Sequence, residues 1–189
     1  FFFKQKTAYE IPKRDWSSDV CSSDLKGLEL ISADIKTRGE ARVDFDKALP
    51  FGDGSFDGVL FFNANYIARD QVFTLKEIRR VLKPGARAYI ASPFLMSEMP
   101  EPHDYMRLTK EGLERVLGEA GLLSNNIEHI DRIGGHFSTE ANMMHSFYLF
   151  DFIRLLAFGR ALLFDRLFWA SAPNRLHPAP MGYFVVVRK

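Results

Sequence analysis

The sequence is short of cysteine, of net charge and of long apolar runs. Cys21 is the one cysteine, so the chain forms neither an internal disulfide nor a cysteine-based zinc site, and a cytoplasmic location is expected. Lys and Arg total 25 against 24 Asp and Glu, which leaves a formal net charge of +1. A net charge this small does not attract nucleic acid by overall electrostatics, so a small-molecule or protein partner is favoured. No metal site is expected.

The first 25 residues differ in character from the rest of the 189-residue chain. The segment FFFKQKTAYEIPKRDWSSDVCSSDL has no helical or strand periodicity beyond the short TAYEI run. It resembles a translated sequencing adapter fused to a gene fragment; the alternative is a natural disordered tail. We therefore predict that residues 1–25 are non-native and lie outside the fold, and that residues 26–189 form one partial domain.

Apolar runs and helix-like segments alternate from residue 26 onward. Leu75, Ile78 and Leu82 recur at helical spacing until a Pro-Gly pair ends the pattern, and Thr109 is a good N-cap for a second helix. Runs typical of strands occupy residues 28–34, 58–62, 87–91, 126–133 and 183–187. This alternation indicates an α/β protein with a doubly wound, mostly parallel sheet.

Three strings carry a family resemblance: LPFGDGSFDGVLF, EIRRVLKPGARAYIASPF and HDYMRLTKEGLERVLGEAGL. Their order and spacing resemble the class I S-adenosylmethionine-dependent methyltransferases of the type 11 subgroup, over residues 28–133 and again at the last strand. The resemblance implies a Rossmann-like sheet of seven strands with the last one antiparallel, and S-adenosylmethionine as cofactor. The second to seventh strands would be residues 28–34, 41–44, 58–62, 87–91, 126–133 and 183–187.

The first strand of that family, and the glycine-rich turn that follows it, are missing from the sequence. No G-x-G-x-x-G occurs, and the Gly52-Asp53-Gly54 loop stands in the wrong place for one. The adapter-like segment occupies the position of the missing strand. We expect a fold that lacks its first strand, an N-terminally truncated methyltransferase, and impaired activity because two inner strand edges lose their partner.

The resemblance assigns cofactor contacts to four residues. Asp34 follows an apolar strand and matches the acid that binds the ribose diol, at the edge where open α/β sheets bind ligands. Asp44 would contact the adenine amine with Phe45 as an apolar wall, and Asp46 is the alternative acid. Asn63 matches a position facing the methionine part of the cofactor. Each acid could instead be a solvated loop residue, and asparagine is common where strands end.

Methyl transfer from a sulfonium is an in-line displacement, so positioning and exclusion of water come first. A general base is needed only for a protonated acceptor. His103 and Asp104 form the candidate acid/base pair, although bracing of the loop before the next helix is the favoured role. His136, which follows a Gly-Gly pair, is a second candidate base.

Residues 147–170 are rich in Phe and Leu but cannot span a membrane, because charged residues interrupt them at Asp151, Arg154, Arg160, Asp165 and Arg166. We predict an amphipathic helix or helical pair, broken at Gly159-Arg160, within a helical insertion over residues 136–180. A packed subdomain or lid beside the substrate mouth is favoured. The alternatives are a dimer surface or apolar substrate lip, and weak membrane-surface contact.

The sequence therefore predicts methyl transfer from S-adenosylmethionine to a small-molecule acceptor. A non-catalytic interaction or scaffold module with the same fold is the alternative. A nicotinamide-dependent reductase is disfavoured, because the Leu-Pro-Phe string has no known role there. Neither the acceptor nor the oligomeric state follows from the residues.

Overall fold

The computed structural model describes eight segments of the chain: residues 2–5, 28–31, 33–34, 41–99, 103–122, 124–144, 150–171 and 179–189. Most of them belong to one six-stranded sheet with the strand order β2-β1-β5-β6-β8-β7. Its strands are β1 (Phe2–Gln5), β2 (Leu28–Ile31), β5 (Phe56–Phe62), β6 (Leu82–Pro93), β7 (Ile127–Ile133) and β8 (Gly182–Arg188). Two short parallel strands, β3 (Ala33–Asp34) and β4 (Ala41–Arg42), pair beside it.

Strand directions agree with the family expectation on one side of the sheet. β5 and β6 run parallel, and β8 lies antiparallel between β6 and β7. The strands predicted at residues 58–62, 87–91, 126–133 and 183–187 fall within β5, β6, β7 and β8. The predicted α/β fold class with an antiparallel last strand is therefore confirmed.

The β1 strand takes the place between β2 and β5, and it runs antiparallel to both. It consists of Phe2–Gln5, so four residues of the segment predicted to lie outside the fold are part of the sheet. The remainder of residues 1–25 lies outside the described residues. The two inner edges that we expected to be unpaired thus face β1. Because β1 is antiparallel, its carboxyl end lies at the edge opposite to the carboxyl ends of β2 and β5.

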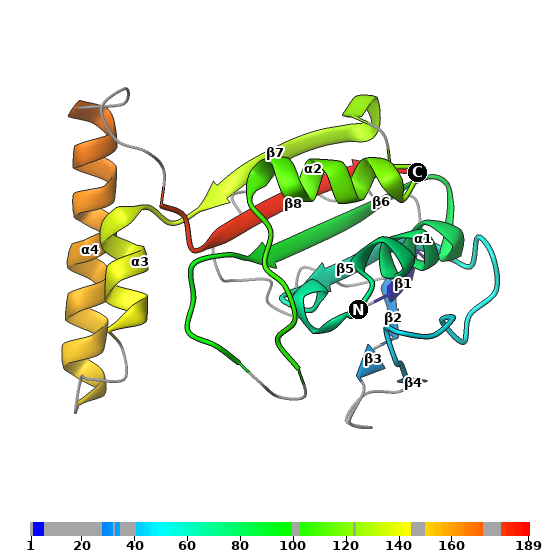
Figure 1. Cartoon of the computed structure of the whole chain (residues 1–189), viewed down its shortest axis with the longest axis horizontal. Coiled ribbons are helices and arrows are strands. Elements are labelled where there is room, and N and C mark those ends of the chain that lie inside the picture. The colour runs from blue at the N-terminus through cyan, green and yellow to red at the C-terminus, as the bar shows by residue number, and fades with distance from the viewer. Residues whose placement is uncertain are drawn as a thin grey trace.

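Two capped helices lie together in front of the sheet in Figure 1: α1 (Gln71–Val81) and α2 (Lys110–Glu119). The Asp70 carboxylate accepts a hydrogen bond from the Phe73 amide, and the predicted cap Thr109 accepts one from Gly112. Their apolar faces complete one core with the strands, which includes Leu75, Ile78, Leu113, Leu117, Val59, Ile90 and Val185. Two short 3-10 helices, η1 (Asn65–Ile67) and η2 (Ser124–Asn126), connect elements.

The Pro-Gly turn predicted after α1 lies inside β6 as an irregularity. Phe56 pairs with Leu82 and Gly58 pairs with Arg87, so β6 accommodates extra residues there. Gly85 adopts a φ of 78°, which favours glycine. The sequence thus located the end of the helix correctly but not the immediate start of the strand.

The helical insertion before β8 contains α3 (His136–Met143) and α4 (Asp151–Ser171). These helices lie side by side at one end of the molecule, beyond the sheet (Figure 1). The break predicted at Gly159-Arg160 is wrong, because α4 runs without interruption through both residues. One glycine costs about 1 kcal/mol inside a helix, which the surrounding strong helix formers tolerate.

Candidate functional site

Strands β2, β5 and β6 run in the same direction, because β1 is antiparallel to both β2 and β5, and β5 is parallel to β6. Asp34 is the last residue of β3 and pairs with Arg42 of β4. Its side chain lies outside the described part of the structure. Asp34 thus lies three residues beyond the end of β2 in the chain, and its contact with the ribose stays a prediction.

Asn63 directly follows β5 and is exposed. Its backbone amide donates a 2.8 Å hydrogen bond to the carbonyl of Ala91 in β6. Its φ of 48° is the one left-handed value among the described residues other than glycine. This conformation, which asparagine tolerates well, turns the chain away from the sheet and towards η1.

Asn65 is a further candidate site residue that the sequence analysis did not name. Its side chain is buried, at 3% exposure, and its Nδ2 donates a 2.7 Å hydrogen bond to Ser92 Oγ at the end of β6. The Asn65 Oδ1 atom has no hydrogen-bond partner. A buried acceptor without a donor is costly, so it is a candidate for meeting a donor group of a ligand. The repeat of asparagine in the string FNAN was the signal for it.

The loop after β4 gives three consecutive residues different surroundings. Asp44 forms a 2.9 Å ion pair with Lys47 and accepts a hydrogen bond from the Asp46 amide. The Lys47 ammonium and that amide hold the pKa of Asp44 below its ordinary value. Phe45 packs edge-on against Phe61 of β5, with ring centroids 5.2 Å apart. Asp44 is therefore a charged acceptor beside an aromatic ring, as an adenine contact requires.

Asp46, the alternative acid, faces a different partner. Its carboxylate accepts a 2.8 Å hydrogen bond from the Arg69 backbone amide, just after η1. The Thr74 hydroxyl donates a 3.0 Å hydrogen bond to the carbonyl of Phe45. These bonds fix the loop after β4 against the segment from η1 to α1.

Asp104 is the centre of a half-buried network in the loop after β6. It forms an ion pair with Arg107 and accepts a 3.0 Å hydrogen bond from the Met99 amide. Arg107 also donates hydrogen bonds to the carbonyls of Met96 and Ser97. Burial raises the pKa of Asp104, but the hydrogen bonds from Arg107 and Met99 outweigh it and the pKa lies below its ordinary value. This carboxylate is ionised and ties the loop together.

His103 stands apart from that network. Its ring is exposed and stacks on Tyr105, with centroids 5.0 Å apart. Tyr105 in turn accepts a 3.3 Å hydrogen bond from Arg69. No hydrogen bond joins His103 to Asp104 among the described contacts, so the two candidates do not form a coupled acid/base pair in this structure.

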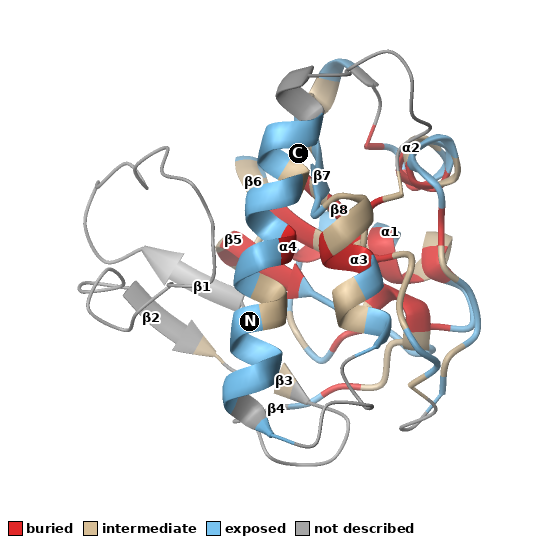
Figure 2. Ribbon diagram, turned by 90° about the vertical axis from the view of Figure 1, so that its left-hand side faces the viewer, coloured by how far each residue is buried: buried red, intermediate tan, exposed pale blue. Residues whose placement is uncertain are grey.

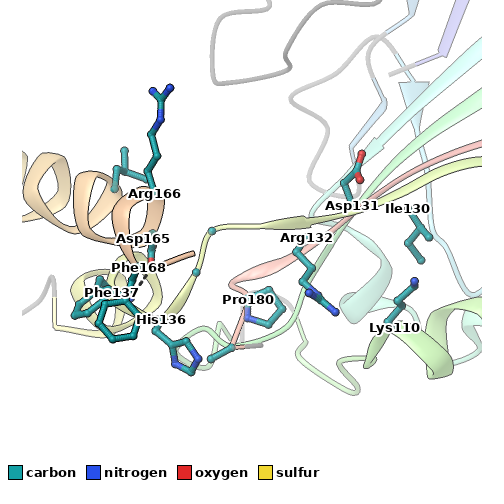
Figure 3. A pocket seen from close by; sticks show the side chains of 14 residues that line it. Lys110, Ile130, Asp131, Arg132, His136, Phe137, Asp165, Arg166, Phe168 and Pro180 are labelled. Carbon is teal, nitrogen blue, oxygen red and sulfur yellow. Dashed lines mark hydrogen bonds between the residues drawn. The ribbon is translucent and has the colours of Figure 1, made fainter. Parts of the chain in front are cut away.

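A cavity of about 600 Å³ lies between the end of β7, the start of α2 and the helical insertion. Figure 3 shows Lys110 and Ile130 on one side of it, and Phe137 and Phe168 on the other. His136 lines this cavity, whereas none of the other predicted site residues does. The predicted residues therefore divide between this cavity and positions outside it.

Comparison with known proteins finds similarity to methyltransferases. Residues 13–90 match the family described as "Methyltransferase domain". The chain is 29% identical over 114 residues to the O-methyltransferase resE of Aspergillus sclerotiorum, covering 54% of this chain and 43% of that protein. It is 43% identical over 54 residues to the O-methyltransferase rstn1 of Aspergillus nomiae, covering 29% of this chain and 24% of that protein. The chain thus spans less than half the length of these curated relatives.

Solved structures with a similar course of the chain include two S-adenosylmethionine-dependent methyltransferases. The one from Mesorhizobium loti has a TM-score of 0.48 at 15% identity, covering 78% of this chain and 68% of that one. The one from Archaeoglobus fulgidus has a TM-score of 0.47 at 14% identity, covering 79% and 66%. The family match covers residues 13–90, less than half of the chain, and agrees with the resemblance of the three sequence strings to class I S-adenosylmethionine-dependent methyltransferases.

The residues present fit part of the family's cofactor. Asp34 and Asp44 are acceptors at strand ends, and the unpartnered Asn65 Oδ1 suits a hydroxyl or ammonium donor. The glycine-rich turn has no counterpart among the described residues, because the carboxyl end of β1 lies at the opposite edge. The described residues thus offer candidate acceptors for the cofactor, but no counterpart of the glycine-rich turn.

Proposed function

We propose that this protein belongs to the enzymes that transfer a methyl group from S-adenosylmethionine to a small-molecule acceptor. One observation carries the proposal: in a chain whose residues 13–90 match a methyltransferase family, Asn63 and Asn65 follow β5, which runs parallel to β6 and in the same direction as β2, the strand that precedes Asp34. The carboxyl ends of parallel strands are where open α/β sheets bind nucleotide-like ligands. S-adenosylmethionine would supply the activated methyl group there.

The protein's own share of the reaction is to bind and orient the donor. In this proposal Asp34 accepts hydrogen bonds from the ribose diol, and Asp44 with Phe45 holds the adenine. Asn63 and Asn65 face the methionine part. The Asp104–Arg107 network holds the loop after β6 in place, which supports positioning and water exclusion, the main requirements of an in-line displacement.

The cavity supports a small-molecule acceptor. Its volume of about 600 Å³ falls within the range of small-ligand pockets, and its aromatic wall with nearby Lys110 suits an aromatic acceptor. The curated relatives are O-methyltransferases by name, so we favour a hydroxyl acceptor. A hydroxyl is protonated at neutral pH, and His136 in the cavity or His103 would then act as the base.

We further infer that the chain of 189 residues is impaired in this reaction. The antiparallel β1 stands where the family has a parallel strand followed by its glycine-rich turn. This same observation favours the second candidate function, a non-catalytic interaction module. Restoring the first strand distinguishes the two candidates, because activity should return in an enzyme and not in an interaction module.

The experiment compares two chains in an assay with radiolabelled S-adenosylmethionine and a panel of phenols. One is the chain as it stands, and the other has residues 1–25 replaced by a strand and glycine-rich turn of the family. We expect turnover only in the second chain. If the second chain folds, binds S-adenosylmethionine and methylates nothing in the panel, the small-molecule acceptor is wrong. If it folds without binding the donor, the module is non-catalytic.

A further inference from the structure

The α4 helix exposes most of its apolar side chains. Leu155 is 75% exposed, Leu156 68% and Phe152 63%, which is unusual for residues of this size. At about 100° per residue, the exposed apolar residues on the side away from α3 fall within an arc of about 140°. We call this the outer face of α4: Phe152, Leu155, Leu156, Leu162, Leu163 and Leu167.

The opposite side of α4 is fixed against α3. Ala157, Ala161 and Asp165 recur every four residues, and Ala161 is 6% exposed. The Asp165 carboxylate accepts hydrogen bonds of 2.9 Å from the backbone amides of Phe137 and Ser138. These contacts orient the helix, so the outer face points away from α3. Figure 2 shows exposed residues along nearly the whole described length of α4.

Among the α4 side chains that the structure describes, the exposed charged ones are positive. Arg154, Arg160 and Arg166 are all exposed, and neither Arg160 nor Arg166 has an ion-pair partner in the described part of the chain. The helix contains two acids, Asp151 and Asp165, and the second is occupied at the start of α3. A partner for this helix must therefore match an apolar face accompanied by arginines.

We propose that α4 lies on the surface of a membrane that contains anionic lipid. Helices that combine Leu and Phe with Arg bind in the plane of such a surface, with the apolar side chains below the headgroups. The 21 residues of α4 measure about 32 Å, and arginine side chains reach back to headgroup phosphates. No helix of the described residues is long and apolar enough to cross a membrane.

The arginines favour this partner over a second copy of the chain. In an antiparallel pair of α4 helices, Arg160 near the helix midpoint would meet Arg160 of the other copy. In a parallel pair, Arg160 and Arg166 would each lie level with their own counterparts. Like charges at such distances are unfavourable, whereas anionic headgroups neutralise both arginines.

The test uses the full chain and vesicles, with binding measured by co-sedimentation. One set of vesicles is phosphatidylcholine alone, and the other contains one part phosphatidylserine to two parts phosphatidylcholine. We expect binding to the anionic vesicles that weakens with salt, and little binding to the neutral ones. The measurement needs neither cofactor nor acceptor, so it is independent of the proposed methyl transfer.

Two variants separate the apolar and charged contributions. The double variant Leu155→Glu/Leu163→Glu should lose binding to both vesicle types. Arg160→Gln/Arg166→Gln should weaken binding to anionic vesicles by about 30-fold, the effect expected for two charges near such a surface. The matched control Lys76→Gln/Arg115→Gln removes two exposed charges from α1 and α2 and should bind like the parent. Far-UV circular dichroism checks the fold of each variant.

Three results would overturn the proposal. The first is a folded chain that binds neither vesicle type. The second is equal binding to neutral and anionic vesicles, or no effect of the arginine variant. The third is a dimer in sedimentation equilibrium that Leu155→Glu/Leu163→Glu dissociates, which would assign the outer face to a second copy.

Discussion

The carboxylate of Asp165 lies 2.9 Å from the backbone amide of Ser138, 27 residues earlier in the chain, and accepts its hydrogen bond. A second oxygen of the same carboxylate accepts a bond from the amide of Phe137. The free amides at the start of a helix normally need a local cap. In α3 the neighbouring helix supplies it, so one side chain both caps α3 and anchors α4.

Replacing Asp165 should therefore loosen the α3–α4 pair. Asp165→Ala leaves two amides of α3 without an acceptor, at a cost of about 1 kcal/mol by analogy with helix caps. Hydrogen exchange should become faster in α3, while the sheet is unchanged. Arg166→Gln, the exposed neighbour, is the control and should leave α3 protected. Unchanged exchange in Asp165→Ala would show that the cap contributes nothing.

Gly135 should not tolerate a side chain while Asp165 is present. A Cβ atom at Gly135 would lie 2.5 Å from Asp165 Oδ1, closer than real Cβ contacts allow. Gly135→Ala is expected to destabilise the protein by about 1–3 kcal/mol in urea unfolding. In the Asp165→Ala background the same substitution should cost much less. Equal costs in both backgrounds would contradict this contact.

The Asp104–Arg107 network should make stability depend on pH in the acid range. Because the pKa of Asp104 is lower in the folded chain than its ordinary value of 3.8, its contribution to stability is complete above that value. The contribution is lost as the pH falls through the lowered folded value. Asp104→Asn should cost about 2 kcal/mol at neutral pH, and the difference from the parent should shrink in acid. Urea unfolding across this range measures it, and a difference that stays constant would refute it.

Substitution of His103 or His136 should affect catalysis without changing stability. Both substitutions, His103→Ala and His136→Ala, are expected to leave the free energy of unfolding nearly unchanged, since neither ring is buried. In a chain with a restored first strand, loss of the base should lower kcat and remove the acid limb of its pH profile. If only one variant shows this loss, that histidine is the base. If neither does, the acceptor needs no base from these two residues.

Much of the fold followed from local sequence. The β-branched and aromatic run in β8 and the helical spacing of Leu75, Ile78 and Leu82 depend on neighbours along the chain, so both were predictable. The continuity of α4 was not predictable, because a single glycine does not end a helix when the residues around it favour helix. Strand β1 was also missed, since four residues without a clear pattern were placed by pairing with β2 and β5.

Sequence motifs predicted candidate site residues, whereas residues whose surroundings depend on tertiary contacts were missed. Strand ends singled out Asp34 and Asn63, and their contacts with the cofactor stay predictions. The sequence grouped Asp165 with the other charged residues of its helix, yet its partners lie 27 and 28 residues away in α3. Asn65 was missed because its importance comes from burial against Ser92 rather than from spacing.

The most direct test is calorimetric titration of S-adenosylmethionine into a chain whose residues 1–25 are replaced by the family's first strand and glycine-rich turn. The account predicts saturable binding that Asp34→Ala weakens at least tenfold, about 1.4 kcal/mol, while Lys76→Gln leaves it unchanged. A folded restored chain that binds no donor, or that binds it equally well with and without the Asp34 carboxylate, would contradict the account.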